Sequence, residues 1–258
     1  MSKLIATIIQ ARISSNRLPG KVLLKACGKT MLEHMIDRVK RAKKIDEVVI
    51  ATTDKAKEDV IENLCKRMNV KCFRGSEEDV LSRYKLASDS VGADIVVRIP
   101  SDNPLVDHRI IDQAIEIFCK NNYEFVSNFS LESTTYPHGF AVEVFSSKVL
   151  AEAEKESKKP SDREHVVFFI SHQPERYSIY QMNYERDLSK YRLTLDYPED
   201  YEVIKSVFEA LYPNNPDFSM DDIICWLEKH PEILKKNSHI KPYQNIFKSF
   251  KEDKKIGF

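Results

Sequence analysis

Short β-branched apolar runs alternate with amphipathic segments through the first half of the chain, and this alternation constrains the fold more than any other feature. Each run lacks a 3.6-residue period and has the length of a buried strand. We predict strands over residues 4–9, 47–52, 70–73, 94–99 and 124–128. Helices between strands imply right-handed crossovers, so the sequence predicts an α/β fold with a mostly parallel twisted sheet and helices on both faces.

The predicted helices begin near recognisable caps. Thr30 and Glu33 fit a capping box ahead of a helix that starts at about Met31. Further helices are predicted over residues 54–68, 77–91 and 107–120. From residue 131 the order changes, with strands expected at 140–145, 177–182 and 191–195 and helices at 148–157, 197–211 and 221–229. Ser161 and Glu164 fit a second capping box, so another helix is expected to start there.

Composition excludes several classes of protein. The 40 Lys and Arg residues balance 40 Asp and Glu residues, so no global positive field exists for non-specific binding of nucleic acid or membranes. Apolar runs are far shorter than the ~20 residues that span a bilayer. The run at residues 4–9 is too short for a signal sequence, and a cytoplasmic protein is expected. The 5 cysteines show no paired Cys-x-x-Cys spacing, which indicates reduced thiols.

A basic loop follows the first strand directly. Residues 10–21 contain Arg12, Arg17 and Lys21 together with Ser14 and Ser15. In parallel sheets ligands bind beyond the carboxyl ends of the strands, and forked guanidinium groups match phosphate oxygens. The loop is therefore a candidate polyphosphate site, although it lacks the glycine and lysine spacing of a P-loop. A merely solvated basic loop is the alternative.

Two later turns each present a carboxylate. Asp102 follows the predicted strand at 94–99, and Asp196 precedes the helix predicted at 197–211. Nucleotide-bound Mg²⁺ needs only one or two protein carboxylates, because phosphates and water complete its coordination. Asp102 could instead bond its own turn, and Asp196 could simply cap its helix. Asp200, one turn later, is expected to be a helix-surface charge.

Several blocks of sequence resemble one family of enzymes. The segment 11–21 (ARISSNRLPGK) closely resembles the opening motif of the cytidylyltransferases that make CMP-activated sugars, the acylneuraminate and 3-deoxy-manno-octulosonate enzymes, and most of all their spore-coat polysaccharide branch. The likeness continues, in order, through residues 75–84 (GSEEDVLSRY), 98–105 (RIPSDNPL), 136–145 (YPHGFAVEVF), 163–166 (REHV) and 192–200 (RLTLDYPED). It covers most of residues 1–235.

The resemblance implies a Rossmann-like nucleotidyltransferase that transfers CMP from CTP to a small acceptor for surface polysaccharide synthesis and releases pyrophosphate. Such chemistry needs positioning and charge neutralisation more than a protein nucleophile. It implies Mg²⁺ held by Asp102 and Asp196, with Arg12, Lys21 and Asp102 as catalytic residues. The implied nucleotide contacts are Ala11, Arg12, Ser14, Ser15, Arg17, Lys21, Arg83 and Ser101. An ordinary ion pair with Asp79 is the alternative role for Arg83.

The resemblance also implies an acceptor site and a homodimer. Residues 1–211 would form the nucleotidyltransferase domain, with residues 131–190 as an inserted elaboration for acceptor binding or dimer contact, and 212–258 would form a helical extension and polar tail. The expected acceptor contacts are Tyr136, His138, Glu143, Arg163, Glu164 and His165. For His165 a core or dimer-contact role is equally open.

One departure from the family concerns the acceptor. Relatives often carry acids in the segment matching 136–141, where this chain has His138 and Ala141. A less negative pocket would favour a small anionic acceptor. An acidic sugar, a phosphorylated small molecule and a phosphonate all remain open.

Two rival functions remain at this point. The first is a nucleotide-sugar glycosyltransferase, but residues 101–103 (Ser-Asp-Asn) lack the second acid of its Asp-x-Asp motif, and that reading leaves the basic loop unexplained. The second is a nucleotide-binding subunit without catalysis. The presence of both candidate metal ligands, Asp102 and Asp196, disfavours it.

Overall fold

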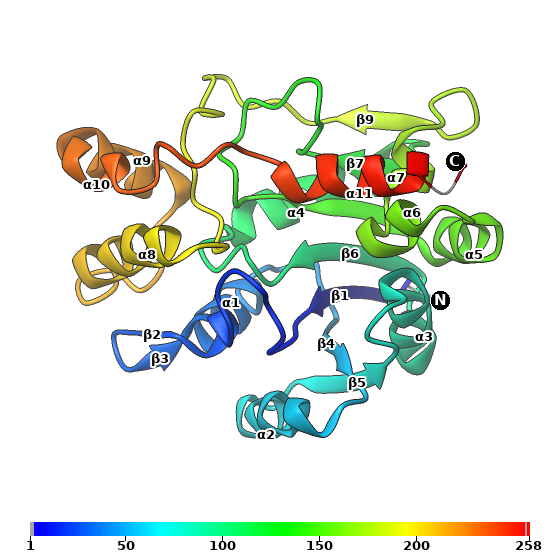
Figure 1. Cartoon of the computed structure of the whole chain (residues 1–258), viewed down its shortest axis with the longest axis horizontal. Coiled ribbons are helices and arrows are strands. Elements are labelled where there is room, and N and C mark those ends of the chain that lie inside the picture. Colours follow the sequence, from blue (N-terminus) through cyan, green and yellow to red (C-terminus); the bar gives the residue numbers. More distant parts are fainter. Residues whose placement is uncertain (1–2, 256) are drawn as a thin grey trace.

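The computed structural model describes residues 3–255 and 257–258. A seven-stranded sheet forms its centre (Figure 1). Its strands lie in the order β5 (Lys71–Gly75), β4 (Glu47–Thr53), β1 (Ile5–Gln10), β6 (Ile95–Pro100), β8 (Glu143–Ser146), β7 (Phe125–Ser127) and β9 (Ile179–Gln181). The first four are mutually parallel, β8 is antiparallel to both of its neighbours, and β9 is parallel to β7. The predicted mostly parallel sheet is confirmed.

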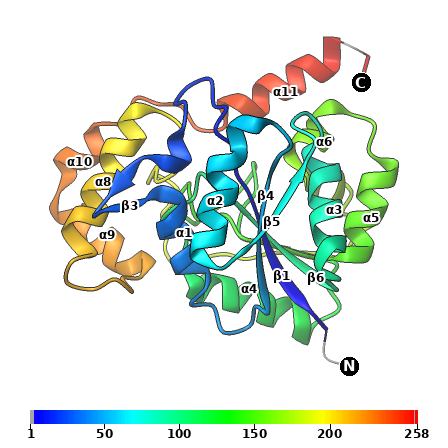
Figure 2. The same ribbon diagram turned by 90° about the horizontal axis from the view of Figure 1, so that it is seen from below.

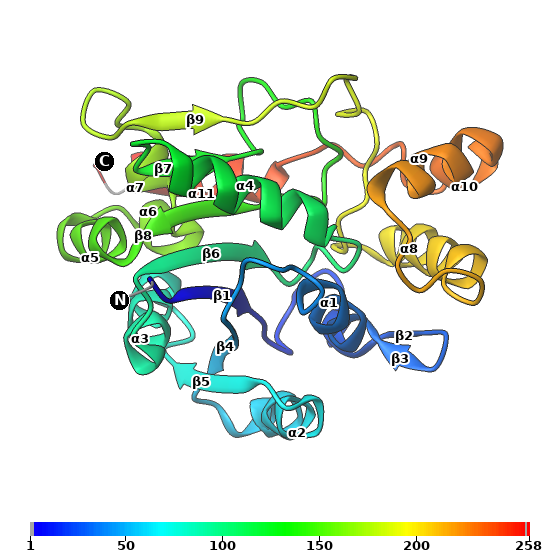
Figure 3. The same ribbon diagram turned by 180° about the vertical axis from the view of Figure 1, so that it is seen from behind.

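Helices cover both faces of the sheet, as predicted. One core contains Ile9, Ile50 and Val97, and it packs against α1 (Met31–Val39), α2 (Asp59–Met68), α4 (His108–Lys120), α8 (Pro198–Leu211) and α9 (Met220–Lys229). The other core contains the alternate residues Ile8 and Val96, and it packs against α3 (Val80–Val91), α5 (Ser147–Glu156) and α7 (Phe168–Ser171). Figures 2 and 3 show these two layers from below and from behind. Successive side chains along a strand point to opposite faces of the sheet, so each strand contributes to both cores.

The order of the strands places a crevice beside β1. From β1 the chain moves outward to β4 and β5, and it then returns to β6 on the other side of β1. The loops that follow β1 and β6 therefore diverge at the carboxyl edge of the sheet, which is where ligands bind in open α/β folds. In the described part of the chain, no helix combines the length and apolar character needed to cross a membrane.

Local caps explain several helix starts. Thr30 and Glu33 form the predicted capping box at the start of α1, just after the short hairpin of β2 (Lys25–Ala26) and β3 (Lys29–Thr30). Asp107 caps α4 by accepting a hydrogen bond from the backbone N–H of Arg109. Short 3₁₀ turns lie at Lys21–Leu23 and Ala56–Glu58.

Three local predictions are wrong. Residues 191–195 form no strand but an extended segment with a single bridge between His138 and Arg192, because its N–H groups bond to loops at the edge of the sheet. Strand β8 begins at Glu143 and not at residue 140. The helix α6 (Pro160–His165) starts at Pro160 without a capping box, since the Ser161 hydroxyl donates a hydrogen bond to Asp253.

The C-terminal part of the chain is helical. After α9 come α10 (Pro231–Lys235) and α11 (Gln244–Lys255), so the polar tail contains a three-turn helix. Figure 1 shows α11, in red, crossing the face of the sheet on the side of α6 and α7, far from α10. Because α11 crosses there, residues from the C-terminal segment reach the crevice beside β1.

Candidate active site

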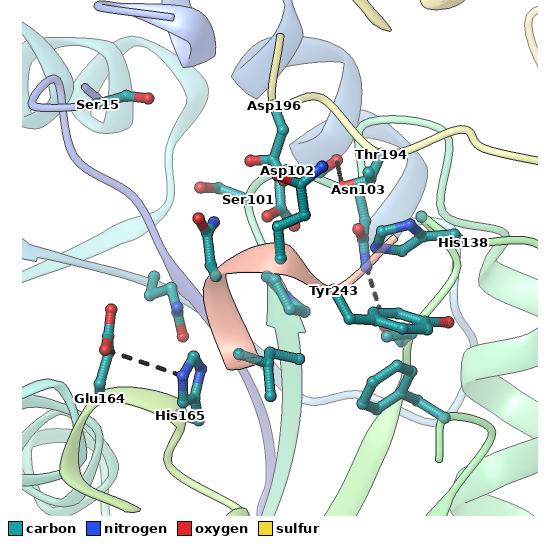
Figure 4. Close-up of a pocket in the computed structure, with 18 of the residues that line it drawn as sticks. Ser15, Ser101, Asp102, Asn103, His138, Glu164, His165, Thr194, Asp196 and Tyr243 are labelled. Atoms are coloured by element: carbon teal, nitrogen blue, oxygen red, sulfur yellow. Dashed lines mark hydrogen bonds and ion pairs between the residues drawn. The ribbon is translucent and has the colours of Figure 1, made fainter. Parts of the chain in front are cut away.

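A cavity of about 560 Å³ opens at the carboxyl edge of the sheet. Its walls come from the loop after β1, the turn after β6, the segments 128–143 and 192–197, and the start of α11. It contains every residue predicted to contact the nucleotide or the metal: Ala11, Arg12, Ser14, Ser15, Arg17, Lys21, Arg83, Ser101, Asp102 and Asp196. Figure 4 shows Asp102 and Asp196 side by side in this cavity.

Buried contacts fix the shape of the basic loop. The fully buried carboxylate of Glu58 accepts a hydrogen bond from the backbone N–H of Ile13 at 2.9 Å. The backbone N–H of Gly20 bonds the carbonyl of Ile13 at 3.0 Å, with Gly20 in the left-handed region at φ 67°. Ser14 donates to Glu77 at 2.5 Å. The loop is thus closed on itself, which holds its cations at the cavity before a ligand arrives.

A cluster of charges occupies the centre of the site. The Lys21 ammonium lies between the two acids, 2.9 Å from Asp196 Oδ1 and 3.8 Å from Asp102 Oδ2. Arg17 lies 2.7 Å from Asp196. Burial alone would raise the pKa of Asp196, but Lys21 and Arg17 lower that pKa to about 2. For Asp102 burial prevails and raises the pKa. Both acids thus lie within reach of one cation, the Lys21 ammonium.

Backbone bonds hold the two acids together. The N–H of Leu195 donates to the carbonyl of Asp102 at 2.8 Å. Asp200 Oδ2 accepts from the N–H groups of Asp196 and Tyr197, each at 3.0 Å. Asp200 is fully buried and forms a two-pronged ion pair with Arg192, with both distances 2.8 Å. The prediction of a surface charge is therefore wrong, because Asp200 orders the turn that presents Asp196.

A close approach of two segments positions His138. A Cβ atom on Gly139 would lie 2.4 Å from the backbone of Leu193, so only glycine allows this packing. His138 Nδ1 accepts a hydrogen bond from Arg192 Nη1 at 3.3 Å, which leaves Nε2 carrying the proton. Burial and the nearby Arg192 lower the pKa of His138 to about 4. His138 is therefore a neutral hydrogen-bond donor at neutral pH.

Buried arginines in the cavity have spare donors. Arg83 is only 2% exposed and donates to the carbonyl of Ser76 at 2.5 Å. Arg98 pairs with Glu143, which faces it in register on β8. Among the described residues, the Nε atoms of Arg17, Arg83 and Arg98 have no acceptor. Buried donors of this kind normally have partners, so the cavity fits an anionic ligand with many acceptors.

Asp79 pairs with Arg163 and not with Arg83. It accepts from Arg163 Nε at 2.8 Å and Nη2 at 2.5 Å, so the alternative of an Arg83 to Asp79 ion pair is wrong. Arg163 also bonds Glu154 and is not among the described residues that line the cavity. Arg163 therefore links α6 to the start of α3.

The remaining acceptor candidates do line the cavity. They are Tyr136, His138, Glu143, Glu164 and His165. His165 Nε2 lies 3.0 Å from Ser249 Oγ, and burial lowers the pKa of His165 to about 4. Sequence reasoning missed the residues of the C-terminal segment, such as Tyr243 and Ser249, because nothing local distinguishes them from a solvated tail.

The residues present fit a divalent metal. The structure brings together no three metal-ligating side chains anywhere in residues 3–255 and 257–258. Two carboxylates that flank a cation nevertheless suffice for Mg²⁺ on a nucleotide, since the phosphates supply the other oxygens. Asp102 and Asp196 are the pair that this structure offers.

The fold and the site together define a nucleotide-binding α/β enzyme with an anion-binding loop at its switch point. A family model described as Cytidylyltransferase matches residues 6–246. The chain therefore belongs to the cytidylyltransferase family and is a CTP-dependent nucleotidyltransferase. Family membership decides against both rival functions, the glycosyltransferase and the non-catalytic subunit.

Relatives and solved structures agree with this assignment. An uncharacterized protein of Methanocaldococcus jannaschii is 36% identical over 246 residues, which are 94% of this chain and 98% of the relative. The spore coat polysaccharide biosynthesis protein SpsF of Bacillus subtilis is 32% identical, over 88% of this chain and 95% of that protein. A cytidylyltransferase from Leptospira borgpetersenii superposes with TM-score 0.86 at 34% identity, over 94% of this chain and 100% of that one.

A more distant structure shares the fold alone. The CMP:2-keto-3-deoxy-manno-octonic acid synthetase complexed with CTP has TM-score 0.59 at 18% identity, over 80% of this chain and 98% of that one. The expectation of a Rossmann-like nucleotidyltransferase fold is confirmed.

Proposed function

We propose that this enzyme transfers CMP from CTP to an oxygen of a small anionic acceptor, with release of pyrophosphate, in the synthesis of a surface polysaccharide. The observation that carries the proposal is the cluster of Lys21, Asp102 and Asp196 at the end of the basic loop. The likeness to the B. subtilis spore coat protein supports the polysaccharide role. A homodimer is part of the proposal and rests on the family resemblance, and the cytoplasmic location stays a prediction from the sequence.

The nucleotide occupies the half of the cavity next to the basic loop. Arg12 and Lys21 neutralise the triphosphate, and Arg17, Ser14 and Ser15 add donors along the same loop. Arg83 and Ser101 also contact the nucleotide. Because the loop is already ordered by Glu58 and Glu77, little reorganisation is needed at the moment of reaction.

Asp102 and Asp196 would hold Mg²⁺. When bound, this ion would supply charge neutralisation on the phosphates and polarise a phosphoryl oxygen. The side chains themselves hold the acceptor oxygen and the α-phosphate in line, while the cations stabilise the charge that passes to the leaving pyrophosphate. No protein nucleophile is required, and the site needs no Ser-His-Asp set.

The acceptor occupies the other half of the cavity, near His138. His138 and Arg192 line that half, and their N–H donors suit an anionic group. Tyr136, Glu143, Glu164 and His165 complete its walls. Ala141, which also lines the cavity, adds no negative charge. This surface supports a carboxylate, phosphate or phosphonate on the acceptor.

Pyrophosphate release from each of the four common nucleoside triphosphates tests the proposal, with Mg²⁺ and a panel of sugar acids, sugar phosphates and phosphonates as acceptors. We expect release from CTP together with at least one anionic acceptor, and formation of the matching CMP conjugate by mass spectrometry. Release with neutral sugars only would overturn the acceptor class. No release from CTP with any member of the panel would count against the whole proposal.

A further inference from the structure

Tyr243 and the first turns of α11 form one wall of the cavity. Tyr243, Asn245, Ser249 and Glu252 all line it. In Figure 4 the pale red ribbon of α11 crosses the view between Glu164 and His165 on one side and Tyr243 and His138 on the other. The family match covers residues 6–246, so it includes Tyr243 and ends within the first turn of α11.

Side chains from both halves of the cavity anchor this wall. Asn245 accepts a hydrogen bond from Arg17 of the basic loop. Ser249 Oγ donates to Glu164 at 2.9 Å, and it also lies against His165. The ring of Phe250 packs 5.5 Å from that of Phe168. Asp253 accepts from the backbone N–H of Ser161 at 3.2 Å. A solvated tail would make none of these contacts.

Tyr243 has an unusual backbone conformation for a residue other than glycine. Its φ of 58° lies in the left-handed region, which residues other than glycine rarely adopt. Residues with this conformation cluster at ligand sites. Its ring lies 4.8 Å from His138 and 5.4 Å from Phe129. The three rings form an aromatic surface at the acceptor end of the cavity, with Arg192 among the neighbouring lining residues.

We infer that Tyr243, held in place by α11, is a specificity-determining residue for the acceptor. Its ring packs against the apolar face of a cyclic sugar, while the anionic group of that sugar faces Arg192 and His138. The same wall keeps water out of the acceptor position. This inference rests on the proposed function and deepens it, because it places part of acceptor selection on a segment outside the nucleotide-binding core.

Three variants of the full chain test the inference. Tyr243→Ala removes the ring, and Tyr243→Phe keeps the ring but removes the hydroxyl. Phe247→Ala is the matched control, because Phe247 lies on the same helix with 51% of its surface exposed. With an acceptor that the wild type uses, we expect kcat/KM for the acceptor to fall about tenfold in Tyr243→Ala and to stay within about twofold in the other two. The KM for CTP should stay within about twofold in all three.

Hydrolysis of CTP without an acceptor gives a second readout. Here the oxygen of water bonds to the α-phosphorus as the bond to the departing pyrophosphate breaks, and the water proton passes to the solvent. We expect Tyr243→Ala to release pyrophosphate about threefold faster than Phe247→Ala, because the wall no longer excludes water.

The outcomes separate the inference from the proposed function. If the wild type transfers CMP but Tyr243→Ala matches Phe247→Ala in acceptor kcat/KM, the inference is wrong and the proposed function stands. If no acceptor is used, hydrolysis in Tyr243→Ala no faster than in Phe247→Ala overturns the inference by itself. A large rise in the KM for CTP in Tyr243→Ala would also overturn it, by placing Tyr243 in the nucleotide half.

Discussion

Lys21 has two acidic partners, which it would give up in the proposed complex with a metal and a triphosphate. In the structure its ammonium neutralises two nearby carboxylates, Asp102 and Asp196, and also bonds the carbonyl of Leu195 at 2.8 Å. A divalent ion between the same acids would take over this neutralisation and free Lys21 for the phosphates. In the proposed mechanism, Lys21 thus keeps the acids together before the substrate arrives and would bind the phosphates afterwards.

This dual role predicts a large effect of Lys21→Ala on nucleotide binding. We expect the Kd for CTP in Mg²⁺, measured by calorimetry, to rise about tenfold or more, because a convergent cation at short range is lost. Lys251→Ala, on an exposed part of α11, is the control and should change the Kd less than twofold, since exposed charges are screened beyond roughly 10 Å. Equal effects of the two substitutions would place the triphosphate elsewhere.

Asp196 and Asp200 are expected to fail in different ways. Asp196→Asn should lower kcat by about 10²-fold and the free energy of unfolding by about 2 kcal/mol, because Lys21 keeps Asp102 as a partner while Arg17 loses its carboxylate. Asp200→Asn should cost about 3–5 kcal/mol of unfolding free energy, since it leaves Arg192 buried with an incomplete partner. Urea unfolding and steady-state kinetics of both variants check this. Similar losses of stability would make Asp196 a structural residue and not a metal ligand.

At the scale of elements, the contact between segments 136–141 and 191–196 decides the geometry of the site. It brings His138 next to Arg192 and holds Asp196 near Asp102. The two segments come closest at Gly139. Neither segment belongs to a strand of the sheet, so their packing depends on a few backbone hydrogen bonds and on the absence of a side chain at residue 139.

Gly139→Ala should therefore damage both stability and activity. The new Cβ would lie 2.4 Å from the Leu193 carbonyl carbon, and Ala would also have to adopt a φ of 114°. We expect a loss of more than about 2 kcal/mol in unfolding free energy and a lower kcat. Gly92→Ala is the control, because Gly92 has a φ of 67° but open space around it, and it should cost only about 1 kcal/mol with kcat unchanged. Equal costs would show that strain in φ, not the close approach, makes residue 139 a glycine.

The elements that sequence predicted well are those with a strong local pattern. The central strands β1, β4 and β6 are buried on both faces, so continuous apolar runs indicate them directly, and Thr30 caps its helix as expected. The segment 191–195 has the composition of a strand but bonds to loops, and no local signal distinguishes the two cases. Ser161 likewise fits a cap, yet its hydroxyl bonds Asp253, which lies 92 residues away.

The site shows the same limit. Residues that follow a strand could be placed at the cavity, because topology alone brings Arg12, Lys21 and Asp102 to one edge of the sheet. Partner choice could not be predicted: Arg163 takes Asp79, and Arg83 bonds a backbone carbonyl instead. Tyr243 and Ser249 reach the cavity from the far end of the chain, where the polar composition gave no reason to expect a wall.

At the scale of the whole molecule, the active site is also where the fold holds two partly buried histidines. His138 and His165 both line the cavity, and burial lowers the pKa of each to about 4. In the unfolded chain the same side chains titrate near their ordinary pKa of about 6.5. Between these two values the unfolded state binds protons that the folded state does not, so the stability of the fold depends on pH in this window.

The sign follows from that difference in proton binding. Stability is complete above a pH of about 6.5, and it falls as the pH drops toward 4, by about 2 kcal/mol for each histidine at a pH of about 5. We therefore expect the free energy of unfolding, from urea titrations near pH 7 and near pH 5, to fall less in His138→Gln than in the wild type, by about 2 kcal/mol. His239→Gln, at an exposed position, is the control and should keep the full wild-type loss. If His138→Gln loses as much stability on acidification as His239→Gln does, then His138 is not held neutral in the folded enzyme.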